Sequence, residues 1–366
     1  MNRVNKSSNS DVLPKVEFED IVSGEGRLNK DISSKFDSRK GTLFEPENIL
    51  YGKLRPYLKN WLFSDFEGVA LGDFWVFEAT DVSVPSFDYY LIQSDDYQKV
   101  ANDTSGTKMP RSDWKNVSST DFAIPSKDEQ KQIGAFFKQL DDTITLHQQK
   151  ITLLTKLKKA MLEKMFPKKG TVIPEIRFNG FANAWEQRKF SELYARSSEK
   201  NDGSIGMDKN ITVAIMQFKN DVKVSTTEYL KTYYTFKLGD IAFEGHQSKE
   251  FRYGRFVEND IGNGIVSHIF AVFRPIQEYD LYFWKYAINN EALMQRILAR
   301  STKASTMMHD LVTNDFLNET FLVPSVKEQK QIGAFLNKLD NLITLHQRKL
   351  DMLKKLKSAC LSEMFI

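Results

Sequence analysis

The chain has 366 residues, enough for two or three domains, and 41% of them are hydrophobic and 27% charged, as in soluble globular proteins. The formal net charge of +3 permits a nucleic-acid partner without requiring one, so any DNA-binding face must be local. A single cysteine, Cys360, excludes an intrachain disulfide and a thiolate zinc cluster, and no signal peptide or apolar run of membrane-spanning length is found. We therefore expect a cytoplasmic protein.

Residues 1 to about 120 predict a mixed α/β region with short strands. The segments 48–51 (NILY) and 74–77 (FWVF) are rich in β-branched and aromatic residues, and glycines interrupt the chain near them. Residues 89–100 favour a helix. The polar segment 105–114, SGTKMPRSDW, predicts a loop that carries positive charge.

Residues 126–166 are strongly helical in pattern. Ser126 is a plausible N-cap, and Glu129 three residues later completes a capping box. We expect a short helix over 128–140 and a longer one that starts at Asp141 or Asp142 and runs to about Met165. The segment 167–170 (PKKG) then breaks the helix and predicts a linker.

Residues 171 to about 320 form a second variable region with a similar plan. Strands are predicted over 211–216, 241–243 and 268–273, and an amphipathic helix over 282–298. The segment 301–310, STKASTMMHD, takes the place that SGTKMPRSDW has in the first region.

The helical segment 125–166 occurs twice in the chain. It returns 199 residues later as 324–365 without a gap, and 26 of 42 positions are identical, whereas the regions ahead of the two copies are much less alike. The chain therefore repeats a scaffold and varies what the scaffold carries.

The two copies share an apolar stripe with steps of three and four residues, which is typical of a helix that packs along its length. The residues expected to pair the helices are Ile144, His147, Ile151, Leu154 and Met161, with Ile343, His346, Leu350, Leu353 and Cys360. We expect an antiparallel, pseudo-two-fold pair centred near Leu153 and Met352, which separates the variable regions by roughly one turn of DNA, about 34 to 36 Å. In that register the two histidines lie at opposite ends, so we favour a role in helix register over metal binding. The alternative is two tandem domains whose helices never meet.

Basic and aromatic residues interleave in equivalent loops of both variable regions. Such loops suit contacts to phosphates and base edges, although an ordinary solvated loop has the same composition. The candidate DNA-binding residues are Lys53, Arg55, Tyr57, Lys59, Lys108 and Arg111 in the first region, and His246, Gln247, Lys249, Arg252, Arg255 and Lys303 in the second.

Motifs of several enzyme classes are missing from the sequence. There is no Pro-Pro pair as in the tetrad of adenine methyltransferases, no GxxxxGK[ST] loop, no HExxH and no GxSxG. We predict no catalytic residue, metal site or cofactor site in this chain. Two alternatives stay open, namely a stand-alone nuclease or methyltransferase and a coiled-coil scaffold without DNA binding.

The repeated IPSKDEQKQIGAFFKQLDDTITLHQQK and VPSVKEQKQIGAFLNKLDNLITLHQRK resemble the conserved regions of type I restriction–modification specificity subunits. LYGKLRPYLKN with GDFWVF, and GDIAFEGHQSKEFRYGRFV with STKAS, resemble two types of target-recognition domain. The resemblance implies an α+β fold with recognition domains over 1–124 and 170–323 and helical spacers over 125–169 and 324–366. It also implies a non-catalytic subunit for defence against foreign DNA, in which each recognition domain reads half of a bipartite double-stranded site.

The same resemblance implies the partners. The helices would dock two modification subunits, which bind S-adenosylmethionine and methylate adenine, and restriction subunits would add cleavage with ATP and Mg. PEIRFNGFANAWEQRKFSEL, from Pro174, resembles the segment that opens a recognition domain, but it precedes only the second region. We expect the first region to have a shortened or differently supplied opening, so its docking surface need not match that of the second.

Overall fold

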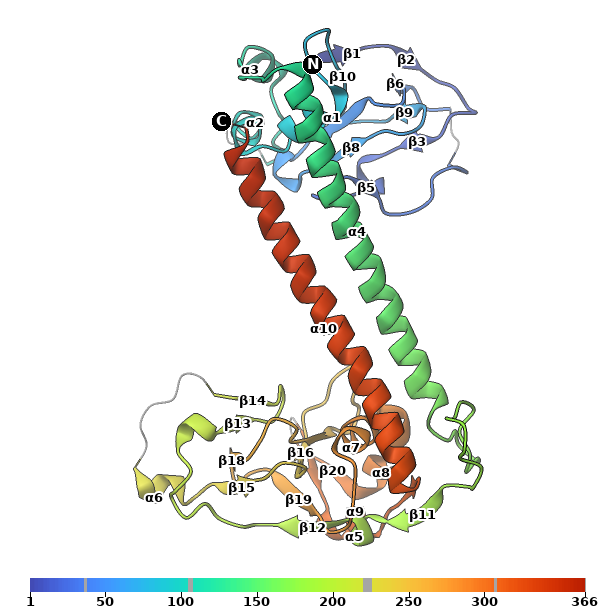
Figure 1. Cartoon of the computed structure of the whole chain (residues 1–366), viewed down its shortest axis with the longest axis vertical. Coiled ribbons are helices and arrows are strands. Elements are labelled where there is room, and N and C mark those ends of the chain that lie inside the picture. The colour runs from blue at the N-terminus through green and yellow to red at the C-terminus, as the bar shows by residue number, and fades with distance from the viewer. Residues whose placement is uncertain (36–37, 105–107, 220–225, 306–307, 366) are drawn as a thin grey trace. The chain divides into compact units, whose positions relative to one another are not determined.

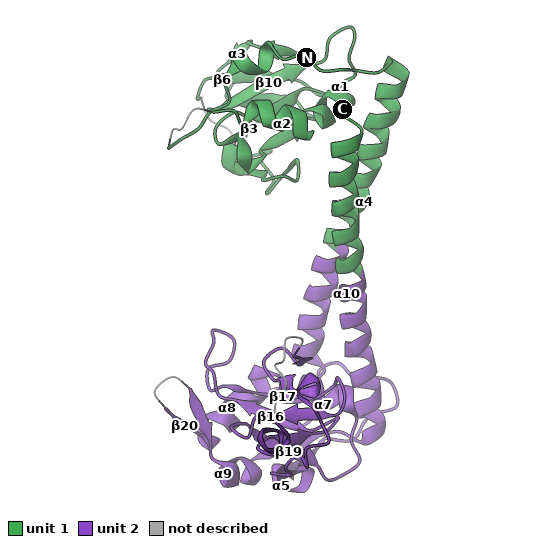
Figure 2. Ribbon diagram, turned by 90° about the vertical axis from the view of Figure 1, so that its left-hand side faces the viewer, with its two compact units in different colours: residues 1–149, 346–366 green, residues 150–345 purple. Residues whose placement is uncertain are grey.

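The computed structural model describes residues 1–35, 38–104, 108–219, 226–305 and 308–365 (Figure 1). The chain forms two compact units, Met1–Gln149 with His346–Ile366 as unit 1 and Lys150–Leu345 as unit 2 (Figure 2). Each unit thus holds one variable region and a part of both repeated segments. The expected division into two recognition domains and two helical spacers follows sequence similarity and not spatial compactness, and it stays a prediction.

Unit 1 is built on two four-stranded sheets. One has the strand order β1-β10-β7-β8, all antiparallel, and the other has the order β2-β6-β9-β3, in which β3 and β9 run parallel. The strands are β1 (Asn2–Val4), β2 (Ser7–Ser8), β3 (Lys15–Val16), β4 (Ile21–Val22), β5 (Arg27–Leu28), β6 (Gly41–Phe44), β7 (Ile49–Gly52), β8 (Trp61–Phe63), β9 (Gly68–Ala70) and β10 (Phe74–Glu78). The predicted strands 48–51 and 74–77 are therefore β7 and β10, which pair with each other.

Unit 2 repeats the first of these sheets. Its four-stranded sheet has the order β12-β19-β16-β17, again all antiparallel. The strands are β11 (Glu186–Lys189), β12 (Tyr194–Ser197), β13 (Ile211–Thr212), β14 (Gln217–Phe218), β15 (Tyr234–Phe236), β16 (Ile241–Glu244), β17 (Arg255–Glu258), β18 (Gly264–Val266), β19 (Ala271–Pro275), β20 (Thr302–Ala304), β21 (His309–Leu311) and β22 (Thr320–Val323). Strand 211–216 ends earlier than expected, at Thr212, and the chain turns there.

The helices predicted over 89–100 and 282–298 are each divided in two by a capping residue. In unit 1, α1 (Pro85–Leu91) ends before Ser94, whose hydroxyl accepts the Tyr97 N–H and starts α2 (Asp95–Ala101). In unit 2, α7 (Leu281–Ile288) and α8 (Glu291–Ser301) are separated in the same way by Asn290. The other short helices are η1 (Phe18–Asp20), η2 (Pro56–Leu58), α3 (Trp114–Ser118), α5 (Phe190–Leu193), η3 (Met207–Lys209), α6 (Thr227–Leu230) and α9 (Thr313–Asn318).

The repeated segments form one continuous helix each, α4 (Lys127–Lys164) and α10 (Val326–Glu363). Ser126 and Ser325 cap them, since each hydroxyl oxygen accepts the N–H three residues later at 3.4 Å. The predicted break near Asp141 is wrong. Asp142 pairs with Lys138 one turn earlier, and Asp141 makes tertiary contacts, so neither carboxylate is free to cap a new helix. Among the described helices, none is long and apolar enough to cross a membrane.

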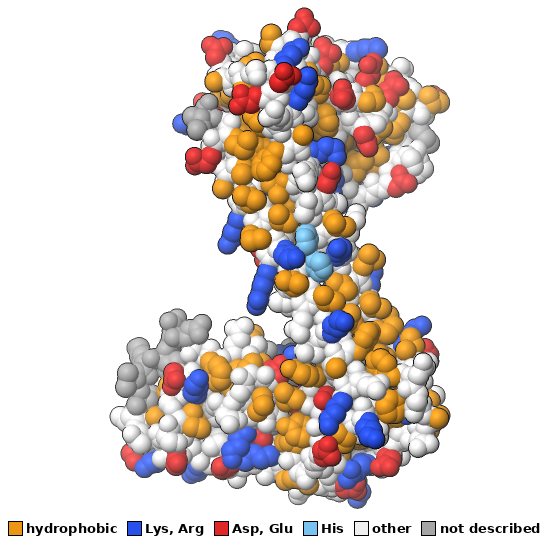
Figure 3. All heavy atoms as spheres, in the orientation of Figure 1, with side chains coloured by type: hydrophobic (Ala, Val, Ile, Leu, Met, Phe, Trp, Pro, Cys, Tyr) orange, Lys and Arg blue, Asp and Glu red, His pale blue; other side chains and the backbone are white. Residues whose placement is uncertain are grey.

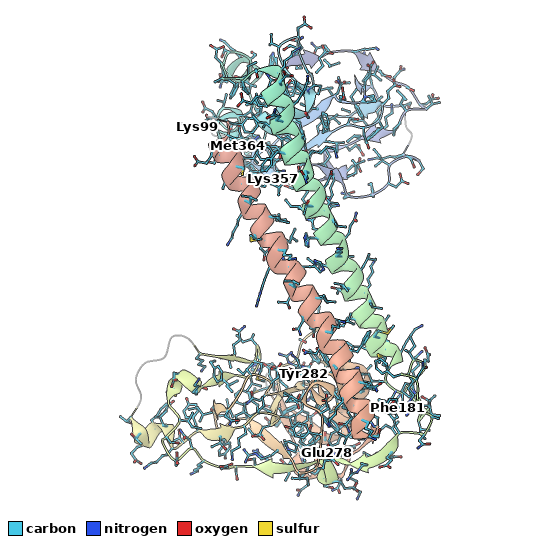
Figure 4. The ribbon with its side chains drawn as sticks, viewed as in Figure 1. Lys99, Phe181, Glu278, Tyr282, Lys357 and Met364 are labelled. Carbon is cyan, nitrogen blue, oxygen red and sulfur yellow. The ribbon has the colours of Figure 1, made fainter. Side chains whose placement is uncertain are left out.

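The helices run antiparallel within each unit. In unit 1, Lys357 of α10 binds the Asp141 carboxylate of α4 at 2.7 Å, whereas His346 contacts His147, further along α4. Lys357, labelled in Figure 4, also lies over the ring of Tyr90, whose hydroxyl donates to Asp141. Unit 2 has an equivalent set, in which Lys158 and Tyr286 both bind Asp340 at 2.6 Å. Its aspartate and lysine are 199 residues from their counterparts in unit 1.

The predicted position of the two histidines is wrong. The Nδ1 atoms of His147 and His346 are 2.8 Å apart in unit 1, and the two imidazoles lie next to each other (Figure 3). The pairing is shifted by about one helical turn from the expected centre, and Leu153 and Met352, which were placed there, are 65% and 63% exposed. One nitrogen must accept while the other donates, and 2.8 Å is shorter than the roughly 3.3 Å between two tetrahedral zinc ligands.

The stripe residues are the less exposed part of the long helices. Ile144 and Leu350 are buried, and the other predicted pairing residues are half-buried, namely His147, Ile151, Leu154, Met161, Ile343, His346, Leu353 and Cys360. Several apolar residues off the stripe are exposed, including Leu146 and Leu345. The stripe residues are thus less exposed than these neighbours, and their role in pairing the two helices stays a prediction.

Candidate nucleic-acid interface

In unit 1 the predicted basic loop follows the buried strand β7. The strand ends in Gly52, where a Cβ atom would lie 2.8 Å from the Phe18 ring and 2.9 Å from the Asn60 carbonyl oxygen, so only glycine fits. The loop then forms the short helix η2, flanked by Arg55 and Lys59. Both residues have left-handed backbone angles, with φ of 49° and 55°, which is costly for side chains of this size. Such strain marks a loop whose shape matters.

The structure brings the two predicted loops of unit 1 together. Leu54 and Arg111 form an antiparallel bridge, the Arg55 N–H donates to the Pro110 carbonyl at 2.7 Å, and the Ser112 N–H donates to the Lys53 carbonyl at 2.8 Å. Backbone hydrogen bonds therefore fix the loop of Lys53 to Lys59 against the segment that carries Lys108 and Arg111. Residues 105–107 of that segment lie outside the described residues.

Asp73 joins the two loops electrostatically. Its carboxylate accepts a bidentate pair of hydrogen bonds from Arg111, at 3.2 and 3.1 Å, and lies 3.9 Å from the Lys53 ammonium. This pairing raises the pKa of the Arg111 guanidinium above its already high ordinary value. Arg111 and Lys53 are partly neutralised and position the loops.

The remaining candidates of unit 1 are more available to a partner. Arg55, Tyr57, Lys59 and Lys108 are exposed, Tyr57 by 57%. Within the described residues none of these three cations has an ion pair in the fold. They can therefore meet phosphate oxygens without first breaking an internal contact.

Unit 2 brings its two predicted loops together in the same way. The His309 N–H donates to the Gly245 carbonyl at 2.8 Å, and His246 forms an antiparallel bridge with Met308. A Cβ atom at Gly245 would lie 2.1 Å from the His309 carbonyl oxygen, so the close approach requires glycine. Gln247 also contacts the His309 imidazole at 2.6 Å. Of the Ser/Thr segment 301–310, residues 306–307 lie outside the described part.

The cations of the second loop differ in how they are used. Arg255 donates to Glu244 on the neighbouring strand and to the Ala214 carbonyl, so its guanidinium already supports the sheet. Arg252 is exposed and lies over the Tyr253 ring, and its backbone N–H donates to Glu291. His246, Gln247, Lys249 and Lys303 are exposed. Arg252, Lys249 and Lys303 are thus the cations of this unit best placed for an external partner.

Sequence reasoning missed the residues that hold these loops. Asp73, Glu244 and His309 are each a partner of a predicted residue, but each comes from a different segment. The one signal in the sequence was position: Asp73 is the last residue before β10, Glu244 is the last residue of β16, and His309 lies in the segment 301–310. Among the described residues no cluster of three metal-ligating side chains is found.

Comparisons with known proteins bear on both loop-carrying regions. A family model described as "Type I restriction modification DNA specificity domain" matches residues 9–156 and again residues 160–355. The chain belongs to this family. The two matches together cover most of the chain, one for each variable region with its helix, so both regions are copies of the same domain type.

Relatives agree with that assignment. The type I restriction enzyme MjaVIII specificity subunit of Methanocaldococcus jannaschii is 24% identical over 275 residues, which is 69% of this chain and 63% of that protein. The chain thus matches less than two thirds of that relative's length. Among solved structures, the type I restriction–modification system S subunit from M. genitalium is 12% identical with a TM-score of 0.61, covering 100% of this chain and 92% of that one. A chain from a study of complex assembly and conformational transition of the type I R-M system is 17% identical with a TM-score of 0.51, covering 95% and 90%. These likenesses show a shared fold.

Proposed function

We propose that this chain is the non-catalytic DNA-recognition subunit of a type I restriction–modification complex. Each unit would read one half of a bipartite double-stranded target through its pair of joined loops. The observation that carries the proposal is that both units join two loops in the same way. In unit 1 the loop after β7 is bridged to the segment before α3, and in unit 2 the loop after β16 is bridged to the segment before α9. Two readers of one design suit a site with two different halves.

The chemistry of the loops suits this role. Exposed arginine and lysine side chains provide sequence-independent contacts to phosphates, and Arg, Gln and Asn side chains can read base edges in the major groove. Unit 1 offers Arg55, Lys59 and Lys108, and unit 2 offers Lys249, Arg252 and Lys303. The strained, hydrogen-bonded backbone of the first loop supports a rigid reading surface, which lowers the entropic cost of binding.

We also propose that the long helices set the spacer and dock two modification subunits. Both copies of the repeat expose the same apolar side chains, Leu146, Leu153 and Leu157 on α4 and Leu345, Met352 and Leu356 on α10. Exposed apolar residues kept at matched positions fit a partner surface. Adenine methylation with S-adenosylmethionine would belong to those partners, and ATP- and Mg-dependent cleavage to restriction subunits. An insertion of four residues near Leu154 should change the spacer and leave both half-sites unchanged.

Methylation sequencing of host DNA with and without the gene tests the proposal. We expect a methylated bipartite motif in the host DNA. The motif should disappear when the gene is removed, even though the modification subunits are still produced. Methylation or cleavage by the purified chain alone would instead favour a stand-alone enzyme. Failure to bind duplex DNA at any salt concentration, even with modification subunits present, would favour a scaffold without a DNA role.

A further inference from the structure

The segment 171–193 of unit 2 docks against the start of α10 and the edge of the recognition domain. Strand β11 pairs antiparallel with β22, with Glu186 opposite Val323. Trp185 is 4% exposed and packs edge-on against Phe166 and Phe283. Unit 2 therefore has a closed edge, because the segment supplies a strand and a buried aromatic ring.

An ion pair fixes this segment to the helix. The Arg177 guanidinium donates to both carboxylate oxygens of Glu328, at 2.6 and 2.8 Å, and the two side chains are 12% and 1% exposed. The next residue, Phe178, packs edge-on against Phe335, which lies about two turns beyond Glu328 along α10. The segment thus covers both a charged and an apolar position of the repeated helix.

The equivalent positions of unit 1 are uncovered. Glu129, the counterpart of Glu328, is exposed and has no ion pair among the described residues. Phe136, the counterpart of Phe335, is 41% exposed, and Ile124 is 40% exposed where Val323 is 5%. Residues 121–124 form no strand, although they directly precede the first copy of the repeat as β22 precedes the second. The same helix sequence is therefore closed in one unit and open in the other.

A cavity adjoins residues 121–123, the counterpart of β22. In unit 1 it measures about 1040 Å³ and is lined by Leu91, Lys99, Phe122, Ala123 and Phe365, among others. Lys99 is labelled in Figure 4. The corresponding cavity of unit 2, beside Phe166, measures about 530 Å³, and there residues 167–171 and Trp185 are part of the wall. The groove in unit 1 is thus larger at the place where unit 2 holds its own segment.

We propose that this groove of unit 1 is a docking site for an extended peptide with the chemistry of residues 171–193, supplied by a different protein and not by a second copy of this chain. Its arginine would pair with Glu129, an aromatic residue would cover Phe136, and a tryptophan would enter the cavity beside Phe365. Its backbone would add a strand along residues 121–124, since an uncovered edge is a template for strand addition. The proposal does not depend on the DNA contacts, because none of these residues lies in the predicted loops.

A labelled synthetic peptide of residues 171–193, titrated into the 366-residue chain and followed by fluorescence anisotropy, tests the proposal. We expect one peptide to bind per chain. Glu129→Arg should weaken binding at least roughly tenfold, because it removes the partner of a desolvated arginine and adds a like charge. A peptide with Arg177→Glu should bind the wild-type chain equally poorly and regain affinity for the Glu129→Arg variant. Asp128→Arg, an exposed neighbour with the same change of charge, is the matched control and should leave binding unchanged.

Four results would overturn the proposal. The peptide fails to bind, or Asp128→Arg weakens binding as much as Glu129→Arg does. Binding depends on Glu328 instead of Glu129, which would mean exchange with the chain's own segment in unit 2. The chain alone self-associates in sedimentation experiments and Glu129→Arg abolishes this, which would make a second copy the occupant.

Discussion

Units 1 and 2 use the same helix repeat in two different surroundings. Glu129 and Glu328 occupy equivalent positions in identical local sequences, EQKQIGAF, yet the first is exposed and the second is 1% exposed in a bidentate ion pair. The difference comes from Arg177, which lies 151 residues away in the sequence. Local sequence therefore set the helix, and the preceding segment decided which of its faces became core.

Asp141 and Asp340, which are equivalent positions of the repeat, have similar surroundings in the two units. Asp141 binds Lys357 and Tyr90, and Asp340 binds Lys158 and Tyr286, with the lysine drawn in each unit from the other copy of the repeat. Each unit is thus completed by residues of both copies. The surroundings of Asp141 and Asp340 are alike, because each carboxylate has a lysine and a tyrosine as partners.

Alanine substitutions at Glu328 and Glu129 should show the largest difference between the two units. Glu328→Ala leaves the Arg177 guanidinium buried without a partner and should destabilise unit 2 by about 3 to 5 kcal/mol. Glu129→Ala should stay within about 0.5 kcal/mol, as for other exposed positions. Hydrogen exchange resolved by mass spectrometry would report each unit separately. Equal losses from the two substitutions would mean that Glu129 is also paired.

Much of the fold followed from sequence, and the failures have identifiable causes. The strands β7 and β10, the long helices and their inward face came from apolar periodicity, which is a local property. The continuity of α4 through Asp141 and the contact of His147 with His346 did not, because both depend on where α10 lies beside α4. Capping residues such as Ser94 were visible in the sequence and were overlooked.

In the candidate site, too, local features could be predicted from the sequence and tertiary contacts could not. The loops themselves could be predicted because they carry glycine, basic and aromatic residues at equivalent places in both regions. The pairing of Arg255 with Glu244 and of Arg111 with Asp73 could not, since these carboxylates are supplied by a neighbouring strand and by a separate loop. Which cations serve the fold and which face solvent is decided by tertiary neighbours.

The two central carboxylates should respond alike. Asp141→Ala and Asp340→Ala each remove the acceptor of a lysine and a tyrosine that are partly withdrawn from water, and each should cost about 2 kcal/mol. The same exchange experiment measures both. Burial, and then the hydrogen bond with Asp340, raise the pKa of Tyr286, so its hydroxyl stays a donor at neutral pH. A loss confined to one of the two variants would contradict their equivalence.

The loop cations should separate into two classes. Arg55→Ala in unit 1 and Arg252→Ala in unit 2 remove exposed cations, and each should weaken DNA binding by the assembled complex by about 1 kcal/mol and reduce the salt slope by about 1. Arg255→Ala should mainly lower the thermal stability of unit 2, because Glu244 loses its partner. Titrations at several salt concentrations and thermal unfolding distinguish the classes. DNA affinity unchanged in both exposed variants would remove these residues from the interface.

The smallest expected effect concerns pH and belongs to unit 2. Glu258 is 3% exposed, and burial, followed by the nearby carboxylates of Asp260 and Asp280, raises the pKa of its carboxyl well above the ordinary value of 4.5. Because the folded pKa is the higher one, stability is fully present below about pH 4.5 and falls as the pH rises toward the folded pKa. Glu258→Gln should therefore raise the melting temperature at pH 7 more than at pH 4.5. An equal shift at both values would show that the carboxyl is ionised in the fold.

The central claim is that each unit reads its own half of the target. Residues 1–120 can be exchanged for those of another member of the family, and the methylated motif of the host can then be sequenced. The account predicts that one half of the motif changes while the other half and the spacer stay the same. A change in both halves, or a change in the half that is read by the untouched unit 2, would contradict it.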